Sequence, residues 1–168
     1  MRKPSDLGYA DDGFILPELH LHEHVIPSAN ETDRLFDIGV KTLDERRRAR
    51  KSSLNDRVEV AADLAAEHPD DQWLVWCDLN DESAALSRSI PESIEVKGAD
   101  TNEHKETSMM GFASGSVRVL VSKPSICGFG MNFQGCHNVI FTGLSDSYEQ
   151  FYQAVRRCWQ IGRASCRE

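Results

Sequence analysis

The sequence has no apolar run of the roughly 20 residues that a membrane-spanning helix needs, and its first residues lack the apolar stretch of a secretory signal. We therefore expect a cytoplasmic protein without a membrane partner. The 40% of hydrophobic and 27% of charged residues are typical of a soluble globular chain. A length of 168 residues is enough for one domain with a buried core and too short for two full α/β domains.

Cysteines paired as C-x-x-C are also absent. Several cysteines lie in apolar runs, where a thiol behaves as a small hydrophobic side chain, so structural roles are favoured over metal binding or catalysis. Outside an oxidising compartment they should be free thiols. They are Cys77, Cys127, Cys136, Cys158 and Cys166.

An excess of positive charge is missing too, since the formal net charge is -8. This excludes a protein that coats nucleic acid by bulk attraction, because the phosphate backbone favours positive surface. Two local basic patches remain, the block at 46–51 and the pair Arg156-Arg157. The block 46–51 fits phosphate contacts and a solvated charged helix equally well.

Three alternating histidines, His20, His22 and His24, would share one face of a strand with room for a metal ion. An exposed polar strand face is the favoured interpretation, and no metal site is predicted.

The chain divides into an irregular N-terminal arm or connector over 1–41 and one domain over 42–163. Apolar residues at helical spacing predict a long helix over 42–67, with Ser52-Ser53 as the place where a break would fall. Beyond it, short apolar runs alternate with helical segments. We predict strands at 73–77, 94–96, 117–121 and 137–141, and helices at 82–90, 102–112 and 147–159. This order predicts an α/β fold, a parallel sheet with helices on both faces.

The most informative stretch is 122–132, which follows a strong strand and places Gly128 and Gly130 where the backbone must turn tightly or approach a partner. Free N–H groups in such a loop can bind phosphate. An ordinary glycine-bearing turn without a ligand is the alternative, and a G-x-G pattern alone does not decide between them.

The helix at 147–159 begins directly after a strand and brings Gln153, Arg156 and Arg157 within about one turn of each other. A guanidinium there can stabilise the charge on a transferring phosphoryl group. Taken alone, a solvated basic helix end that favours the helix dipole is the simpler interpretation.

In this order, and separated by one strand, the two stretches resemble motifs V and VI of the superfamily 2 helicases, most closely the Swi/Snf-type branch. The matching residues are Ser122, Gly128, Gly130 and Asn132 in the loop and Gln153 and Arg157 in the helix. The strand at 73–77, with 78–80 after it, looks like motif IV. The resemblance covers about 58–163 and implies the C-terminal RecA-like domain (P-loop NTPase-type) of such a motor.

The resemblance further implies ATP bound between two RecA-like domains, with Arg157 as the catalytic arginine at the terminal phosphate. Its implied partners are DNA or RNA, ATP and an N-terminal helicase domain. It implies cofactor binding by Gly128, Gly130, Asn132, Gln153 and Arg157, and nucleic-acid binding by Ser122 and Lys123.

Two departures from the family pattern matter. The sequence has no G-x-x-x-x-G-K-[ST] and no Asp-Glu box, so ATP and Mg²⁺ would be held mainly by the missing N-terminal domain, and the chain alone should be inactive. In addition, Gln160 stands where the family has its second arginine. We interpret 160–168 as a non-native tail, because its codons can be written as a common sequencing-adapter sequence.

Two other functions stay open. A Rossmann-type nucleotide-binding enzyme would carry its glycines after the first strand, whereas here they follow the third. A non-catalytic α/β module that binds nucleic acid or protein through basic helices is the other alternative.

Overall fold

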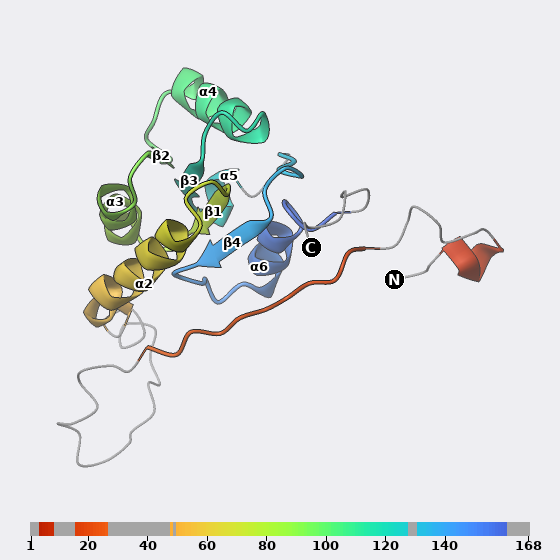
Figure 1. Cartoon of the computed structure of the whole chain (residues 1–168), viewed down its shortest axis with the longest axis horizontal. Helices are drawn as coiled ribbons and strands as arrows, with labels where there is room; N and C mark the ends of the chain where they lie inside the picture. Colours follow the sequence, from red (N-terminus) through yellow and green to blue (C-terminus); the bar gives the residue numbers. More distant parts are fainter. Residues whose placement is uncertain (1–3, 9–15, 27–47, 49, 128–130, 161–168) are drawn as a thin grey trace, which may run out of the picture.

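Four parallel strands form one sheet in the order β2-β3-β1-β4 (Figure 1). The computed structural model describes residues 4–8, 16–26, 48, 50–127 and 131–160. The strands are β1 (Trp73–Trp76), β2 (Ser93–Val96), β3 (Val119–Ser122) and β4 (Asn138–Phe141). The helices are η1 (Pro4–Leu7), α2 (Leu54–Glu67), α3 (Asn80–Ser89), α4 (Asn102–Ala113), α5 (Pro124–Cys127) and α6 (Tyr148–Val155).

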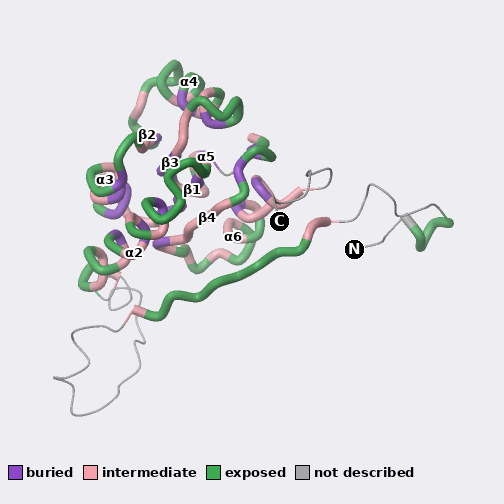
Figure 2. The backbone as a smooth tube through the Cα atoms, in the orientation of Figure 1, coloured by how far each residue is buried: buried purple, intermediate pink, exposed green. Residues whose placement is uncertain are grey.

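The side chains of β1 alternate between two apolar cores, one on each face of the sheet. Trp73 and Val75 pack with residues of α2 and α3. Leu74 and Trp76 pack with residues of α4, α5 and α6. All four side chains are buried, as expected for a strand that has neighbours on both edges and helices on both faces. The predicted α/β sheet covered on both faces is therefore confirmed (Figure 2).

The predicted long helix is broken at Ser53, close to the expected place. Residues 48 and 50–52 are helical, Ser53 lies in a turn, and α2 starts at Leu54. The rest of the predicted first half lies outside the described residues. A separate helical segment therefore leads into the domain before α2 begins.

Helix α6 ends earlier than the sequence predicts, and α5 was not predicted at all. After Val155 the chain makes tight turns, in which Arg157 N donates to Ala154 O and Cys158 N to Val155 O. These bonds leave the carbonyl of Arg157 free to accept from Phe133 N at 2.9 Å. The shortened helix thereby joins the end of α6 to the segment before β4.

The described parts of the N-terminal arm are residues 4–8, which hold η1, and residues 16–26, which have no regular secondary structure and are mostly exposed (Figure 2). The predicted strand at His20, His22 and His24 is wrong, because no strand of the described residues pairs with this segment, whereas their expected exposure is confirmed. The arm is attached to the domain through Trp159, whose indole Nε1 donates to Pro17 O at 2.8 Å. No helix in the described ranges is long and apolar enough to cross a bilayer.

Candidate functional site

Ser122 lies at the carboxyl end of β3, the edge where ligands bind in parallel sheets. Its side chain is fully buried, and its hydroxyl donates to Val96 O at 2.8 Å and contacts Cys127 Sγ at 3.2 Å. The hydroxyl thus joins the end of β2 to α5. A direct contact with nucleic acid stays a prediction and would require these bonds to break.

Lys123 follows directly and begins the turn into α5. Its carbonyl accepts hydrogen bonds from Ile126 N at 2.9 Å and Cys127 N at 3.1 Å, and its side chain is half-buried. Gly128 and Gly130 lie outside the described residues. Asn132, just beyond them, is exposed.

Arg157 is the residue that joins the two predicted motifs. Its guanidinium donates from Nη1 to Met131 O at 2.9 Å and from Nη2 to Gln153 Oε1 at 3.1 Å. Together with the bond from Phe133 N to the carbonyl of Arg157, these contacts attach α6 to the segment that follows the glycine loop. The predicted pair Gln153 and Arg157 is brought together, with Gln153 in α6 and Arg157 in the turn that follows it.

One nitrogen of Arg157 has no hydrogen-bond partner among the described residues. Its Nε atom is buried and unpaired, although a buried N–H is ordinarily satisfied. The guanidinium therefore retains donor capacity that its present contacts do not use.

The neighbouring Arg156 lies in a different environment. Its guanidinium carbon stands 5.3 Å from the centre of the Trp159 ring, a cation–π contact. Its carbonyl accepts from Gln160 Nε2 at 2.9 Å, and Gln160 Oε1 accepts from Gln134 Nε2 at 3.1 Å. Gln160 is thus accommodated on the domain surface beside the end of α6.

A set of charged residues that the sequence analysis missed surrounds the loop after β1. Glu82 is buried, pairs with Arg57, and accepts hydrogen bonds from Asp78 N at 2.9 Å and Leu79 N at 3.0 Å. A Cβ on Gly143 would lie 2.5 Å from Glu82 Oε2, so only glycine fits there. The one available signal was the position of Glu82, the third residue of a helix, from which a carboxylate reaches back to the preceding N–H groups.

The thiols of the domain are buried and free, as predicted for four of the five; Cys166 lies outside the described residues. Burial raises the pKa of Cys77 to about 12 and also raises the pKa of Cys127. Such thiols are poor nucleophiles and poor metal ligands. In the part of the chain that the structure describes, no group of three metal-ligating side chains comes together.

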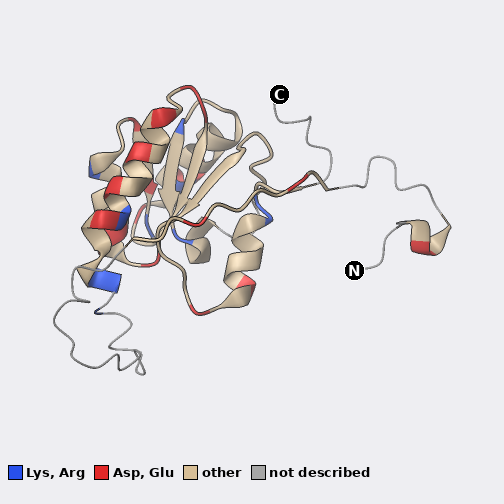
Figure 3. Cartoon of the chain, turned by 60° about the horizontal axis from the view of Figure 1, so that its bottom comes forward, with Lys and Arg blue, Asp and Glu red and all other residues tan. Residues whose placement is uncertain are grey.

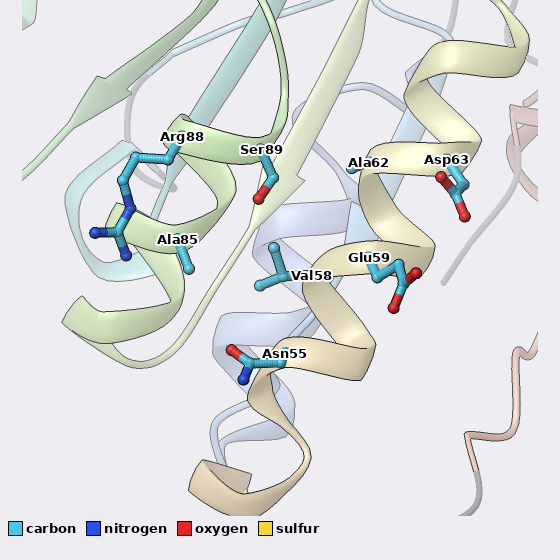
Figure 4. Close-up of a pocket in the computed structure, with 8 residues that line it drawn as sticks. All are labelled: Asn55, Val58, Glu59, Ala62, Asp63, Ala85, Arg88 and Ser89. Carbon is cyan, nitrogen blue, oxygen red and sulfur yellow. The ribbon is translucent and has the colours of Figure 1, made fainter.

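A groove of about 350 Å³ lies elsewhere, between α2 and α3 (Figure 4). Its lining consists of Asn55, Val58, Glu59, Ala62, Asp63, Ala85, Arg88 and Ser89. None of the predicted site residues belongs to it.

The acidic charge is concentrated away from α6. The ribbon of α2 carries several acidic positions (Figure 3), of which Asp56, Glu59, Asp63 and Glu67 are exposed. Because like charges repel the phosphate backbone, this helix face is unsuited to nucleic acid.

Comparison with known proteins adds two findings. Residues 56–162 match the family model described as "Helicase conserved C-terminal domain". No curated protein matches the chain.

Among solved structures, the C-terminal part of the Fun30 ATPase domain is similar with a TM-score of 0.56 and 15% sequence identity, covering 64% of this chain and 38% of that chain. T4 UvsW is similar with a TM-score of 0.51 and 17% identity, covering 67% of this chain and 24% of that one. The chain thus spans less than half the length of either structure. At these identities the likeness concerns the fold.

Proposed function

Because the chain belongs to the family of helicase conserved C-terminal domains, with a RecA-like fold, we propose that it is the second half of an ATP-dependent, Swi/Snf-type superfamily 2 translocase or helicase. In this proposal an N-terminal RecA-like domain holds most of ATP and its Mg²⁺. The present domain supplies Arg157, from the turn that follows α6, to the shared site. It also links that site to the nucleic-acid backbone through the loop after β3.

The observation that carries the proposal is the pair of hydrogen bonds made by Arg157. They fix one guanidinium between α6 and the segment after the glycine loop, so that a change at either element moves the other. A preorganised arginine stabilises the charge that develops on a transferring phosphoryl group. The Nε of the same side chain is buried and unpaired among the described residues, so the guanidinium would have to shift before this donor could reach a ligand.

Binding of the nucleic-acid backbone would fall to the start of the same loop. Lys123 follows the carboxyl end of β3, and its charge already acts on the nearby Cys77 thiol. Its ammonium is a point charge suited to a phosphate group. The hydroxyl of Ser122, the residue before Lys123, holds the end of β3 to the end of β2. Asn132 is exposed after the loop.

The experiment is an ATP hydrolysis assay on two proteins, with and without DNA or RNA. One protein is this chain alone, and the other is the longer polypeptide that the proposal requires, with a phosphate-binding loop in its N-terminal half. Hydrolysis by the longer protein only, stimulated by nucleic acid, is the expected result. Nucleic-acid binding without any hydrolysis by the longer protein would overturn the proposal in favour of a non-catalytic binding module.

A further inference from the structure

We infer that Arg50 is a positioning residue that couples the segment entering the domain to the start of α6. Arg50 belongs to the basic block 46–51 and lies in the short helical stretch before the turn at Ser53. Its side chain contacts two carboxylates, Asp78 and Asp146, in loops that follow β1 and β4. The functional meaning of this coupling rests on the proposed function, because Arg157 lies in the turn that follows α6 and bonds to Gln153 of that helix.

The geometry is a bridge made by one guanidinium between two loops, here called the Arg50 bridge. Arg50 Nη1 lies 3.0 Å from Asp78 Oδ2, and Nη2 lies 3.2 Å from Asp146 Oδ1. Asp78 follows β1 and Asp146 follows β4, and these two strands are neighbours in the sheet. A planar guanidinium can donate to two carboxylates at once, which a lysine ammonium does less well.

The first end of the bridge is rigid. The backbone N–H of Asp78 donates to the buried carboxylate of Glu82, which is itself paired with Arg57 of α2. Arg57 also donates to Ser53 Oγ at the turn between the entry segment and α2. The loop after β1 is thereby held to α2 and α3, which pack against one core of the sheet.

The second end of the bridge lies at the first turn of α6. Asp146 directly precedes Ser147, whose hydroxyl caps α6 by accepting from Gln150 N at 3.3 Å. Ser145 Oγ donates to Gln150 Oε1 at 2.9 Å on the same turn. A displacement of Asp146 would therefore also displace Ser145 and Ser147, whose hydrogen bonds to Gln150 form the start of α6.

Charge and burial distinguish this bridge from an ordinary surface pair. The side chains of Arg50 and Asp78 are 25% and 29% exposed, and that of Asp146 is 52% exposed. The neighbouring pair Lys51–Asp81 is 63% and 69% exposed with a separation of 3.6 Å, so the bridge is more buried than that pair at each end. Ion pairs that are half removed from water are screened less than exposed ones. The two pairs belong to one basic block, so Lys51 provides a matched control.

Hydrogen exchange of the 168-residue chain tests the inference without requiring any enzymatic activity. The variants are Arg50→Ala, Asp146→Asn, their combination, and Lys51→Ala as the control. We expect amides of 144–151 to exchange about 1.5-fold to fivefold faster in Arg50→Ala and Asp146→Asn, in line with ion pairs of this exposure. The double variant should be no faster than the faster single one, because both changes remove the same contact. Lys51→Ala should leave this segment unchanged.

Unchanged exchange at 144–151 in Arg50→Ala would overturn the inference. An equal rise in the exchange rate of the β3 amides would also overturn the inference, because it would show a loss of overall stability rather than of local positioning. Additive effects in the double variant would also contradict it. Failure of the proposed function appears in a different assay, as absent ATP hydrolysis by the longer protein, so the two outcomes are distinguishable.

Discussion

The guanidinium of Arg157 donates to the backbone oxygen of Met131 over 2.9 Å, which joins the helix after β4 to the segment before it. The same guanidinium holds Gln153 one turn earlier. Two stretches that the sequence places on either side of a strand thus meet at one side chain. This contact is the structural basis for treating them as one site.

The contact of Arg157 predicts a loss of stability when it is removed. In Arg157→Ala, Gln153 and the carbonyl of Met131 lose a charged donor, and such bonds contribute about 1.5–3 kcal/mol each at most. We expect the free energy of unfolding of the chain to fall by about 2 kcal/mol. Urea denaturation followed by Trp fluorescence measures it. Arg88→Ala, which removes an exposed arginine of α3, should change it by less than about 0.5 kcal/mol.

The buried pair Glu82–Arg57 predicts a larger loss of stability than the contact of Arg157 does. Glu82→Ala leaves the Arg57 guanidinium without its partner and removes the acceptor of two backbone N–H groups. We expect a destabilisation of about 3–5 kcal/mol, because removing one member of a buried pair leaves an uncompensated charge. The control is Glu59→Ala on the exposed side of α2. Equal midpoints in thermal unfolding for the two variants would contradict this role of Glu82.

Gly143 predicts a steric effect at the same place. An added Cβ would lie 2.5 Å from Glu82 Oε2 and 3.1 Å from Asp78 N, so Gly143→Ala must displace the buried carboxylate. We expect a cost of about 1–3 kcal/mol, as for other overpacked sites. Gly98→Ala is the matched control, because the nearest atom to its Cβ is 4.0 Å away. Circular dichroism melting curves of both variants give the comparison.

The raised pKa of Cys77 predicts that the free energy of unfolding decreases as the pH becomes alkaline. Burial raises this pKa from 9.0 to about 12, so the folded chain keeps the thiol proton where the unfolded chain loses it. The contribution to stability is fully present below about pH 9 and is lost as the pH rises toward about 12. Free energies of unfolding between pH 8 and about 11 should fall more steeply for the natural chain than for Cys77→Ala. Parallel slopes would show that Cys77 does not titrate this way.

The fold was predictable because its signals are local. Apolar runs such as 73–77 and 117–121 identify buried strands, and helical spacing identifies the helices between them, so the layered sheet follows. The early end of α6 at Val155 had no such signal, because it depends on turns stabilised by a contact with Phe133.

The candidate site was predictable only in part. Gln153 and Arg157 share a helix face by spacing alone, and they are in contact. The Arg50 bridge was out of reach, since Arg50 and Asp146 are 96 positions apart and no periodicity relates them. Ser122 shows the opposite limit, because the resemblance implied nucleic-acid binding by this residue while its hydroxyl bonds inside the domain.

The most direct test of the account is the rate of nucleic-acid-stimulated ATP hydrolysis by the longer, two-domain protein carrying Arg157→Ala. If Arg157 reaches the terminal phosphate, kcat should fall at least about a hundredfold, as for the loss of other phosphate-stabilising arginines. Arg88→Ala should retain the full rate and confirm that the protein tolerates loss of an exposed arginine. An unchanged kcat in folded Arg157→Ala protein would contradict the assignment of Arg157 to the ATP site.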